Sequence, residues 1–459
     1  MVRHVGFLAM LILGTQIATA QGLFEGSASE PARATEEVKS IELGGYARGA
    51  AYGGGEAYDY SSLFGEFVLK GRLSEGKAFL FGDIRFRAGK IFDQSQTDLQ
   101  LKEVYAGFKG KKIDVFLGNQ IVVWGRTDGF NPTNNLHPND YFFLTPDPDD
   151  QKLSNFMLRA KIRFTPQMEL DMIAIPYYRP SVYRYDLFDM NEGTRFLDMT
   201  LPAANFRNSG LAARLNFELP GAGFSSSYFH GYDPFYGYTI DSLNLSPALD
   251  IQLRPSAYKK DVFGADFSVP LSTWIVQGEA ALTFTKNYEA AMHIPNPDLY
   301  YVLALEHDVN GYLAILQYIG KYTLDYKELV ALVIPTPVEP TDPYYMAYLI
   351  SLMQYGSGLV YYESALFNRK IFRQQEKTNH ALMLSVSKSF AYETIRAELS
   401  CYYNFTSKEY LIRPDLKWKT SDALSISLGG SIMKGPKDTV YDRAGKVLNG
   451  AYVGMTVTF

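Results

Sequence analysis

Hydrophobic and polar residues alternate along most of this chain, and the alternation keeps its parity over many consecutive positions. In residues 158–164 (LRAKIRF), basic residues occupy every second position and apolar residues lie between them. Residues 80–88 (LFGDIRFRA) and 395–405 (IRAELSCYYNF) repeat the pattern. A helix would break this parity within four residues, whereas a strand places the two kinds of residue on opposite faces. The pattern therefore predicts strands with one apolar and one polar face.

Such segments continue from residue 37 to the end of the chain, and they number about eighteen. The predicted strands are 37–52, 60–72, 77–89, 97–109, 112–124, 153–165, 167–178, 208–218, 222–232, 258–269, 272–286, 298–308, 311–325, 376–390, 392–406, 409–419, 422–434 and 448–459. Tight turns such as 74–76 and 110–111 alternate with long connections such as 125–152, 179–207, 233–257 and 326–375. Short periplasmic turns and long extracellular loops are typical of a bacterial transmembrane barrel. The link at 407–408 is a departure, because it is short on the outer side.

The last strand ends on an aromatic residue, Phe459, with apolar residues at every second position before it. A soluble protein rarely ends in an unpaired edge strand, whereas a barrel closes its last strand against its first. A soluble sandwich or propeller would also alternate, but no repeat of propeller period is visible. In lipid, every backbone N–H and C=O group needs a hydrogen-bond partner within the protein. A sheet meets this requirement only when it closes into a barrel. The fold class predicted is all-β, a transmembrane antiparallel β-barrel of about 18 strands.

The N-terminal residues predict export. Arg3 precedes a short apolar run at 5–14, and Ala18-Thr19-Ala20 is a typical cleavage site, so residues 1–20 are predicted to be a signal peptide. The apolar run is too short to cross a bilayer. Residues 21–36 form a polar, flexible leader, too short for a plug domain, and 37–459 form the barrel. The predicted location is the outer membrane.

Composition agrees with this prediction. The chain has 34 Tyr, 30 Phe, 3 Trp and 38 Gly, and aromatic residues form the interfacial girdles of such barrels. The single Cys401 rules out an intramolecular disulfide framework. A net charge of −5, spread along the chain, argues against nucleic acid as a partner.

The interior of a barrel this wide is not filled by its own wall, so it leaves an aqueous channel unless loops enter it. Residues 125–152 are the best candidate for a loop that narrows the pore, because this segment is far longer than a hairpin needs. The candidate constriction residues are Arg126, Asp128, Asn131, His137 and Asp140, and the aromatic trio Tyr141-Phe142-Phe143 could fix the loop to the wall. An ordinary surface loop is the alternative, and the sequence leaves both open.

Basic residues gather on the lumen parity of two strand groups. The wall candidates are Arg85, Arg87, Arg159, Lys161 and Arg163. They could form a basic ladder that favours anionic solutes. Alternatively, they pair with neighbouring lumen carboxylates and contribute little to solute selectivity. The sequence favours this second interpretation.

The segment 339–373 contains an apolar and aromatic run at 344–355 (YYMAYLISLMQY) without strict alternation, which predicts a helix of about three turns. It could plug the lumen, cap the mouth or dock a partner. Burial against other loops is the default expectation, because a patch this apolar is rarely left facing water.

Enzymatic and metal-binding patterns are weak. The chain has no G-x-S-x-G motif, and its six His residues have no common metal spacing. His230 near Asp233 is the closest acid–histidine pair. The acidic run Asp147, Asp149 and Asp150 could hold Ca²⁺, although such runs are more often solvated loops. We therefore expect neither an enzyme nor a cofactor or metal site.

Residues 118–140 (GNQIVVWGRTDGFNPTNNLHPND) resemble a group of Gram-negative outer-membrane barrels similar to alginate-export-type porins. The matching positions are Gly118, Gln120, Trp124, Gly125, Asp128, Pro138 and Asp140. The match covers about a twentieth of the chain, and it implies a passive channel or export conduit. The arginine clusters expected of an alginate exporter cannot be mapped, so that substrate is not implied.

Together these features predict an outer-membrane porin through which small hydrophilic solutes diffuse passively. The alternative is a plugged barrel that acts as a scaffold or binding partner, with a homo-oligomer or protein contact through residues 340–373. The solute, its charge and the oligomeric state are not specified by the sequence.

Overall fold

The computed structural model describes residues 39–54, 60–127, 129–188, 193–246 and 248–459. Eighteen of its strands form one closed antiparallel barrel. They are β1 (Ser40–Gly53), β2 (Tyr60–Glu75), β3 (Ala78–Ile91), β4 (Gln94–Lys109), β5 (Ile113–Gln120), β6 (Asn155–Thr165), β7 (Met168–Ile175), β9 (Gly210–Leu219), β10 (Ala222–Tyr232), β13 (Lys259–Leu271), β14 (Trp274–Thr285), β15 (Asp298–Val309), β16 (Tyr312–Thr323), β17 (Thr378–Phe390), β18 (Ile395–Asn404), β19 (Glu409–Lys419), β20 (Leu424–Lys434) and β21 (Gly450–Thr458). Each pairs with its neighbours in this order, and β1 also pairs with β21, which closes the barrel.

These strands confirm the predicted fold class and the predicted number of strands. Each of the eighteen predicted segments overlaps one barrel strand, with ends that differ by a few residues. The signal peptide predicted at 1–20 and the leader predicted at 21–36 lie outside the described residues, so both stay predictions.

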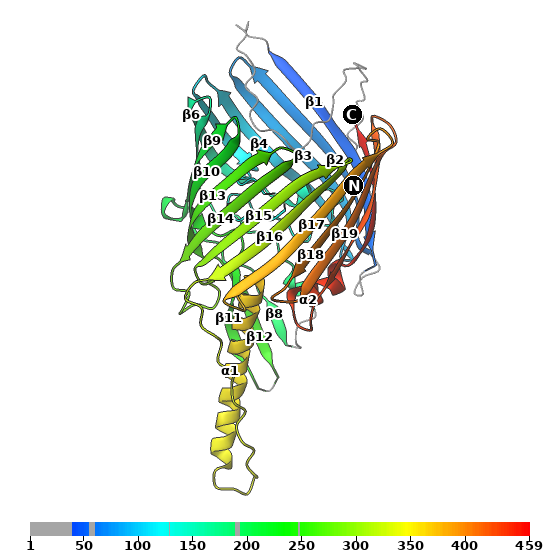
Figure 1. Cartoon of the computed structure of the whole chain (residues 1–459). Helices are drawn as coiled ribbons and strands as arrows, with labels where there is room; N and C mark the ends of the chain where they lie inside the picture. Colours follow the sequence, from blue (N-terminus) through cyan, green and yellow to red (C-terminus); the bar gives the residue numbers. More distant parts are fainter. Residues whose placement is uncertain (1–38, 55–59, 128, 189–192, 247) are drawn as a thin grey trace, which may run out of the picture.

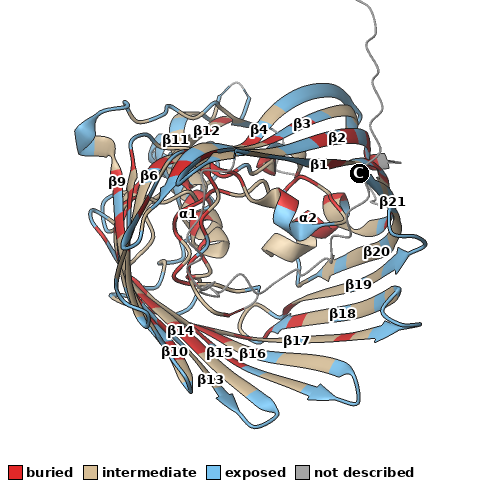
Figure 2. Ribbon diagram, turned by 90° about the horizontal axis from the view of Figure 1, so that it is seen from above, coloured by how far each residue is buried: buried red, intermediate tan, exposed pale blue. Residues whose placement is uncertain are grey.

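The two faces of the wall differ as the alternation predicts (Figure 2). Phe67, Phe86 and Leu99 are directly opposite one another on three neighbouring strands, and all are exposed on the outer face. One position along, Glu66 and Arg87 are opposite each other and form an ion pair inside the barrel. An exterior this apolar is stable against lipid but not against water, because exposing a large apolar surface to water is unfavourable.

The two ends of the barrel differ in their connections. Tyr46 of β1 is opposite Thr458 of β21, so both ends of the barrel sequence lie at the same rim. The turns at this rim contain two to four residues, whereas most connections at the other rim are long. Two short links, 92–93 and 405–408, also lie at the long-loop rim. The second of these is the departure that the sequence indicated.

The long connections contain structure that the sequence analysis did not predict. A small sheet combines β8 (Thr194–Phe196), β11 (Gly237–Asn244) and β12 (Asp250–Ser256). Three 3₁₀ turns, η1 (Pro148–Gln151), η2 (Tyr185–Leu187) and η3 (Phe206–Asn208), and a short helix, α2 (Val440–Leu448), complete these loops.

The helix predicted at 344–355 is much longer in the structure, where α1 spans Tyr345–Ile371. It projects from the long-loop rim away from the barrel (Figure 1). The expectation that this apolar segment is buried is wrong for its first half, since Met346, Ile350 and Met353 are exposed. Of the described helices, none is long and apolar enough to span a bilayer.

Candidate functional site: a loop that crosses the lumen

The connection between β5 and β6, residues 121–154, enters the barrel and crosses it; we refer to it as the crossing loop. Phe130 at its tip stacks on Tyr402 of β18, with ring centroids 5.3 Å apart. Phe130 also packs against the buried wall cluster that contains Val302, Ile319, Ala381 and Tyr402. Counted around the closed barrel, β18 lies nine strands from β6, which is half of the eighteen. The loop therefore reaches the wall opposite its own origin.

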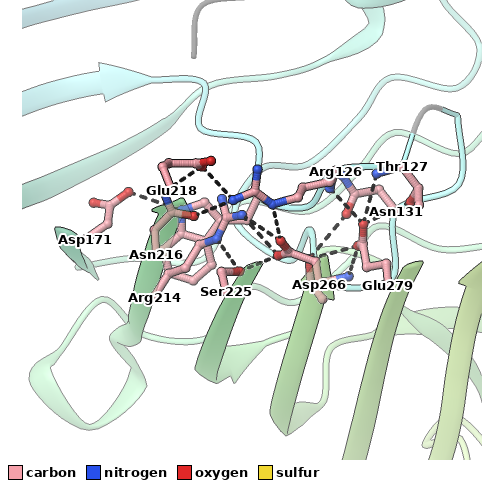
Figure 3. A network of polar contacts seen from close by, with 12 residues as sticks. Arg126, Thr127, Asn131, Asp171, Arg214, Asn216, Glu218, Ser225, Asp266 and Glu279 are labelled. Atoms are coloured by element: carbon pink, nitrogen blue, oxygen red, sulfur yellow. Dashed lines mark hydrogen bonds and ion pairs between the residues drawn. The ribbon is translucent and has the colours of Figure 1, made fainter. Parts of the chain in front are cut away.

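Arg126 fixes the first part of the crossing loop to the wall (Figure 3). Its Nε donates to Asp266 of β13 at 2.7 Å, and its Nη2 donates to Glu218 of β9 at 2.6 Å and to Asn216 at 2.8 Å. Asp266 is also paired with Arg214, 3.0 Å away. We call this group the Arg126 clamp. Charge-assisted bonds of this kind define both the position and the direction of the loop.

Glu279 of β14 holds the same part of the loop through hydrogen bonds. Its carboxylate accepts from the backbone N–H of Arg126 at 3.1 Å and from the Thr133 N–H at 2.7 Å. It also accepts from the hydroxyls of Thr127 and Thr133 at 2.9 and 2.8 Å (Figure 3). Gly125, with a φ of 106°, allows this approach, because a Cβ there would collide with Asn131 and Glu279. The glycine is thus required by close contact as well as by its backbone conformation.

Asp150 fixes the last part of the loop to a different stretch of wall. Its carboxylate pairs with Arg48 of β1 and Arg85 of β3, each 2.6 Å away, and Lys102 donates to its backbone oxygen at 2.6 Å. We call this group the Asp150 clamp. Burial would raise the pKa of Asp150, but Arg48 and Arg85 outweigh burial and hold the pKa at about 2. The carboxylate is therefore fully ionised at neutral pH.

Each of the five predicted wall cations has a carboxylate partner. Arg85 pairs with Asp150 and Asp83, Arg87 with Glu66, Arg159 with Asp171, Lys161 with Glu169, and Arg163 with Asp114. The distances between the closest atoms are 2.6–2.9 Å. The geometry agrees with the pairing interpretation that the sequence favoured over an unpaired basic ladder.

The other predicted loop residues have local contacts. His137 is buried, and its Nε2 lies 2.8 Å from the Asn134 amide while its Nδ1 lies 3.1 Å from the Pro138 carbonyl. Burial lowers the pKa of His137 to about 4, so the ring is neutral at pH 7. Asp140 accepts from the backbone N–H groups of Phe142 and Phe143, both at 3.0 Å. Asn131 lies beside Gly125, and Asp128 lies outside the described residues.

Of the aromatic trio, Phe143 packs on the wall as the sequence suggested, whereas Tyr141 and Phe142 pack on residues of the long-loop rim. Phe143 lies against Phe64 of β2, with ring centroids 5.5 Å apart, and the Arg87 guanidinium is 3.6 Å from its ring centroid. Phe142 packs among the aromatic residues of the long-loop rim, including Phe188 at 5.9 Å. These contacts attach the loop to the wall between the two clamps.

Several residues of the site were not singled out from the sequence. Asp266, Glu218 and Glu279 stand on the polar parity of their strands, and that parity is the signal that could have selected them. Nothing in a single sequence relates them to a loop more than 90 residues earlier, since the relation depends on barrel closure.

Arg373 is a further residue that sequence reasoning missed. It follows α1, and its guanidinium lies 5.6 Å from the ring centroids of both Phe130 and Tyr402. Among the described residues, no carboxylate lies within ion-pair distance of it; the nearby Glu409 instead accepts from Tyr441 N–H at 2.7 Å. Arg373 lines a cavity of about 440 Å³ between the crossing loop and the wall of β13–β16.

The residues that gave weak enzymatic and metal-binding signals have other partners in the structure. His230 contacts Asp261, 2.8 Å away, and Asp233 pairs with Lys260, so the pairing suggested for His230 and Asp233 is wrong. Asp150 belongs to its clamp, and within the described part of the chain no three His, Cys, Asp or Glu side chains gather in a way that could hold a metal ion.

A closed 18-strand barrel with an apolar exterior, a charged interior and a loop across its lumen defines the class of outer-membrane channel folds. Solved structures agree. OpdK from Pseudomonas aeruginosa aligns with a TM-score of 0.52 over 92% of this chain and 98% of that chain, at 8% identity. OccAB3 from Acinetobacter baumannii gives 0.51 over 91% and 99%, at 10% identity, and OccD3 from P. aeruginosa gives 0.51 over 93% and 92%, at 10% identity. At such identities the likeness establishes the fold.

Sequence comparison adds no family, since neither a family model nor a curated protein matches the chain. The resemblance of residues 118–140 to alginate-export-type porins stays a prediction. In the structure this segment forms the end of β5 and the start of the crossing loop, where Trp124 is buried and donates to Asp171 at 3.2 Å.

Proposed function

We propose that this chain is an outer-membrane channel through which small hydrophilic solutes diffuse passively, with the crossing loop as its constriction. The observation that carries the proposal is the path of the loop, which spans the lumen and is held by ionic clamps on two separate parts of the wall. A loop held in this way narrows an aqueous interior without filling it. Arg126, Asn131, His137 and Asp140, together with Asp128, would shape the narrowest part.

The wall cations would define the width of the passage more than its selectivity. Arg85, Arg87, Arg159, Lys161 and Arg163 are each neutralised by a carboxylate, so they add little net potential for a passing ion. Arg373 differs, because it contributes a positive charge to a cavity without an ion-pair partner among the described residues. We infer a modest preference for anions along this side of the lumen.

The backbone of Arg373 supports this role. Its φ of 56° is the left-handed conformation that ends many helices and that glycine adopts most easily. A non-glycine residue there costs about 1 kcal/mol. A helix end with a purely structural role would be more stable with glycine. We therefore infer that arginine is present at this position for its guanidinium group.

Conductance in planar bilayers tests the proposal. Purified full-length protein should open steady ion-conducting channels whose current rises linearly with voltage. A barrel that inserts into the bilayer and carries no current would instead support the alternative, a plugged barrel that serves as a scaffold.

A specific observation supports a second, additional function at residues 340–373. The first half of α1 projects beyond the barrel with apolar side chains exposed (Figure 1). A homo-oligomeric contact or a protein partner could use this surface without any change in the pore.

A further inference from the structure

The segment that projects beyond the long-loop rim is a hairpin. Residues 329–344 lead away from the barrel, and the first part of α1, residues 345–362, returns toward it; we call 329–362 the projecting hairpin. Leu332 of the outward chain lies against Gly358 of the helix. Positions 343–362 contain no Asp, Glu, Lys, Arg or His, although 20% of the whole chain is Asp, Glu, Lys or Arg. Six tyrosines and two methionines lie in the same twenty residues.

The base of the hairpin is fixed. Asn368, buried in the last turns of α1, accepts from Tyr238 N–H at 2.8 Å and donates to the Tyr238 carbonyl at 2.8 Å. Gln374 bonds with Asn296 and Asp298 on the other side. The helix is therefore held in one direction by the barrel rim, and its exposed part does not fold back onto the protein.

The exposed part of α1 carries apolar side chains on two of its faces. Met346, Ile350 and Met353 follow one face at helical spacing, and all are more than half exposed. Leu352 and Leu359 are exposed on another face. A contiguous apolar surface of this kind typically marks an interaction site, because leaving it in water is unfavourable.

We propose that the projecting hairpin inserts into an uncharged, apolar groove of another protein at the cell surface. The inference rests on the proposed function and on the orientation predicted from the sequence, in which the long-loop rim faces outward. Tyr and Met are enriched in the cores of protein interfaces, whereas Lys, Glu and Asp are depleted there, and residues 343–362 of the hairpin have this composition, with Glu339 and Asp342 lying just before them. Helix-in-groove binding is a common way to recognise such a segment.

The area that the hairpin offers matches enclosure. The helical part of the hairpin, residues 345–362, forms a cylinder about 27 Å long and about 10 Å wide, with a lateral surface of about 850 Å², part of which the outward chain covers. A flat partner would cover less than half of it, whereas a groove that encloses both legs of the hairpin would approach the roughly 800 Å² that each partner buries in a stable complex. Because residues 343–362 carry no charged side chain, complementarity requires that the part of the groove in contact with them be uncharged as well.

The geometry disfavours the other occupants. Two copies in one membrane have parallel axes, and α1 lies inside the outline of its own barrel when viewed along the axis (Figure 2). The two barrels therefore hold the two helices apart. Helices pack against each other only when their axes are about 10 Å apart. A lipid surface is also a poor match, because the hairpin points away from the barrel and lacks the charged face of interfacial helices.

Photo-crosslinking in intact cells tests the proposal. A benzophenone amino acid at Met353 should form one dominant adduct with a second protein, whose crosslinked peptide lies in an uncharged groove. The Ile350→Glu substitution should reduce this adduct at least tenfold. Tyr392→Glu, which places the same charge at a fully exposed turn on the opposite rim, should leave it unchanged.

The purified pair completes the experiment. The full-length barrel should bind the identified partner one to one, with at least tenfold weaker binding for Ile350→Glu. An adduct made only of this chain, an adduct with lipid, no adduct, or an adduct indifferent to Ile350→Glu would each overturn the proposal. Bilayer conductance of the same variants reports separately on the channel function.

Discussion

The carboxylate of Glu279 illustrates how single residues are used in this lumen. It accepts hydrogen bonds from Arg126, Thr127 and Thr133. All three lie on the crossing loop, which begins after β5 and not beside β14. A buried carboxylate without such donors would be strongly destabilising. Here the charge therefore holds the crossing loop against the wall.

Removing one residue of the Arg126 clamp should loosen the loop. Arg126→Ala leaves Asp266, which is buried, with Arg214 as its remaining cation. Breaking a buried ion pair of this kind costs about 3 kcal/mol. We expect larger single-channel conductance with more open-channel noise in planar bilayers. Arg254→Gln, which breaks an exposed pair with Asp241 in the small sheet, is the matched control and should conduct like the wild type. Equal conductance of all three proteins would contradict the role of the clamp.

Acid should release the other clamp. The pKa of Asp150 is held at about 2, below its ordinary value of 3.8, so the ionised form stabilises the folded loop at pH above about 4. This contribution is lost as the pH falls from about 4 through about 2, and it corresponds to about 2 kcal/mol. Conductance recorded across this range should rise as the pH falls. Asp150→Asn should show the higher conductance already at pH 7, and a wild-type trace that is flat between pH 5 and pH 2 would refute the linkage.

The charge of Arg373 should be measurable as selectivity. Arg373→Gln removes the positive charge that lacks an ion-pair partner beside the cavity, so the ratio of anion to cation permeability should fall severalfold, as measured from reversal potentials in a salt gradient. Lys327→Gln removes an equal charge that is exposed and paired with Glu289 outside the lumen. If both variants shift the reversal potential equally, the effect belongs to the surface and not to the passage.

At the scale of elements, the barrel strands could be predicted nearly in full, whereas the long helix was predicted only in its first half. Each barrel strand carries its own alternation, so its identity is written in ten or so consecutive residues. The helix was expected to end near Tyr355, because the apolar and aromatic run that predicted it ends there. It continues to Ile371 because Asn368 and Phe367 pack on the small sheet, and Leu332 covers Gly358. Long-range contacts thus override a weak local preference.

The hairpin and the crossing loop should behave differently when shortened. Replacing residues 330–358 with a Gly-Ser linker removes no contact of the barrel interior, so assembly and conductance should match the wild type. Replacing 127–149 with the same linker removes the constriction, so conductance should increase. Gel migration with and without heating reports assembly, and bilayer recording reports conductance. Loss of current in the first variant would place the hairpin in the conducting path.

At the scale of the whole molecule, one contact between the ends of the chain completes the barrel. The backbone of Phe459 exchanges two hydrogen bonds with Gly45, each at 3.0 Å, and its ring stacks on Phe67 with centroids 5.6 Å apart. The ring packs over Gly45, whose missing side chain leaves room for it. Closure removes the last free strand edge, which lipid cannot solvate.

Deleting Phe459 should therefore impair assembly. We expect a severalfold lower fraction of heat-modifiable, protease-resistant barrel, with unchanged conductance in the molecules that do assemble. Phe459→Tyr keeps the aromatic ring and is expected to assemble like the wild type. Normal assembly of the deletion variant would show that the terminal ring is dispensable for closure.

The sequence by itself determined the wall of this protein. Alternation is a local property of each strand. Because lipid lies outside the barrel and water inside, the alternation stays consistent from Ser40 to Phe459. The strands and their inward face could therefore be derived residue by residue. Only the tertiary structure decided which charges meet. Arg126 reaches Asp266 and Asp150 reaches Arg48 because the closed barrel brings distant strands around one loop, and no local pattern encodes those distances. The last strand indicates how the barrel closes, whereas the contacts across the lumen decide how the crossing loop lies within it.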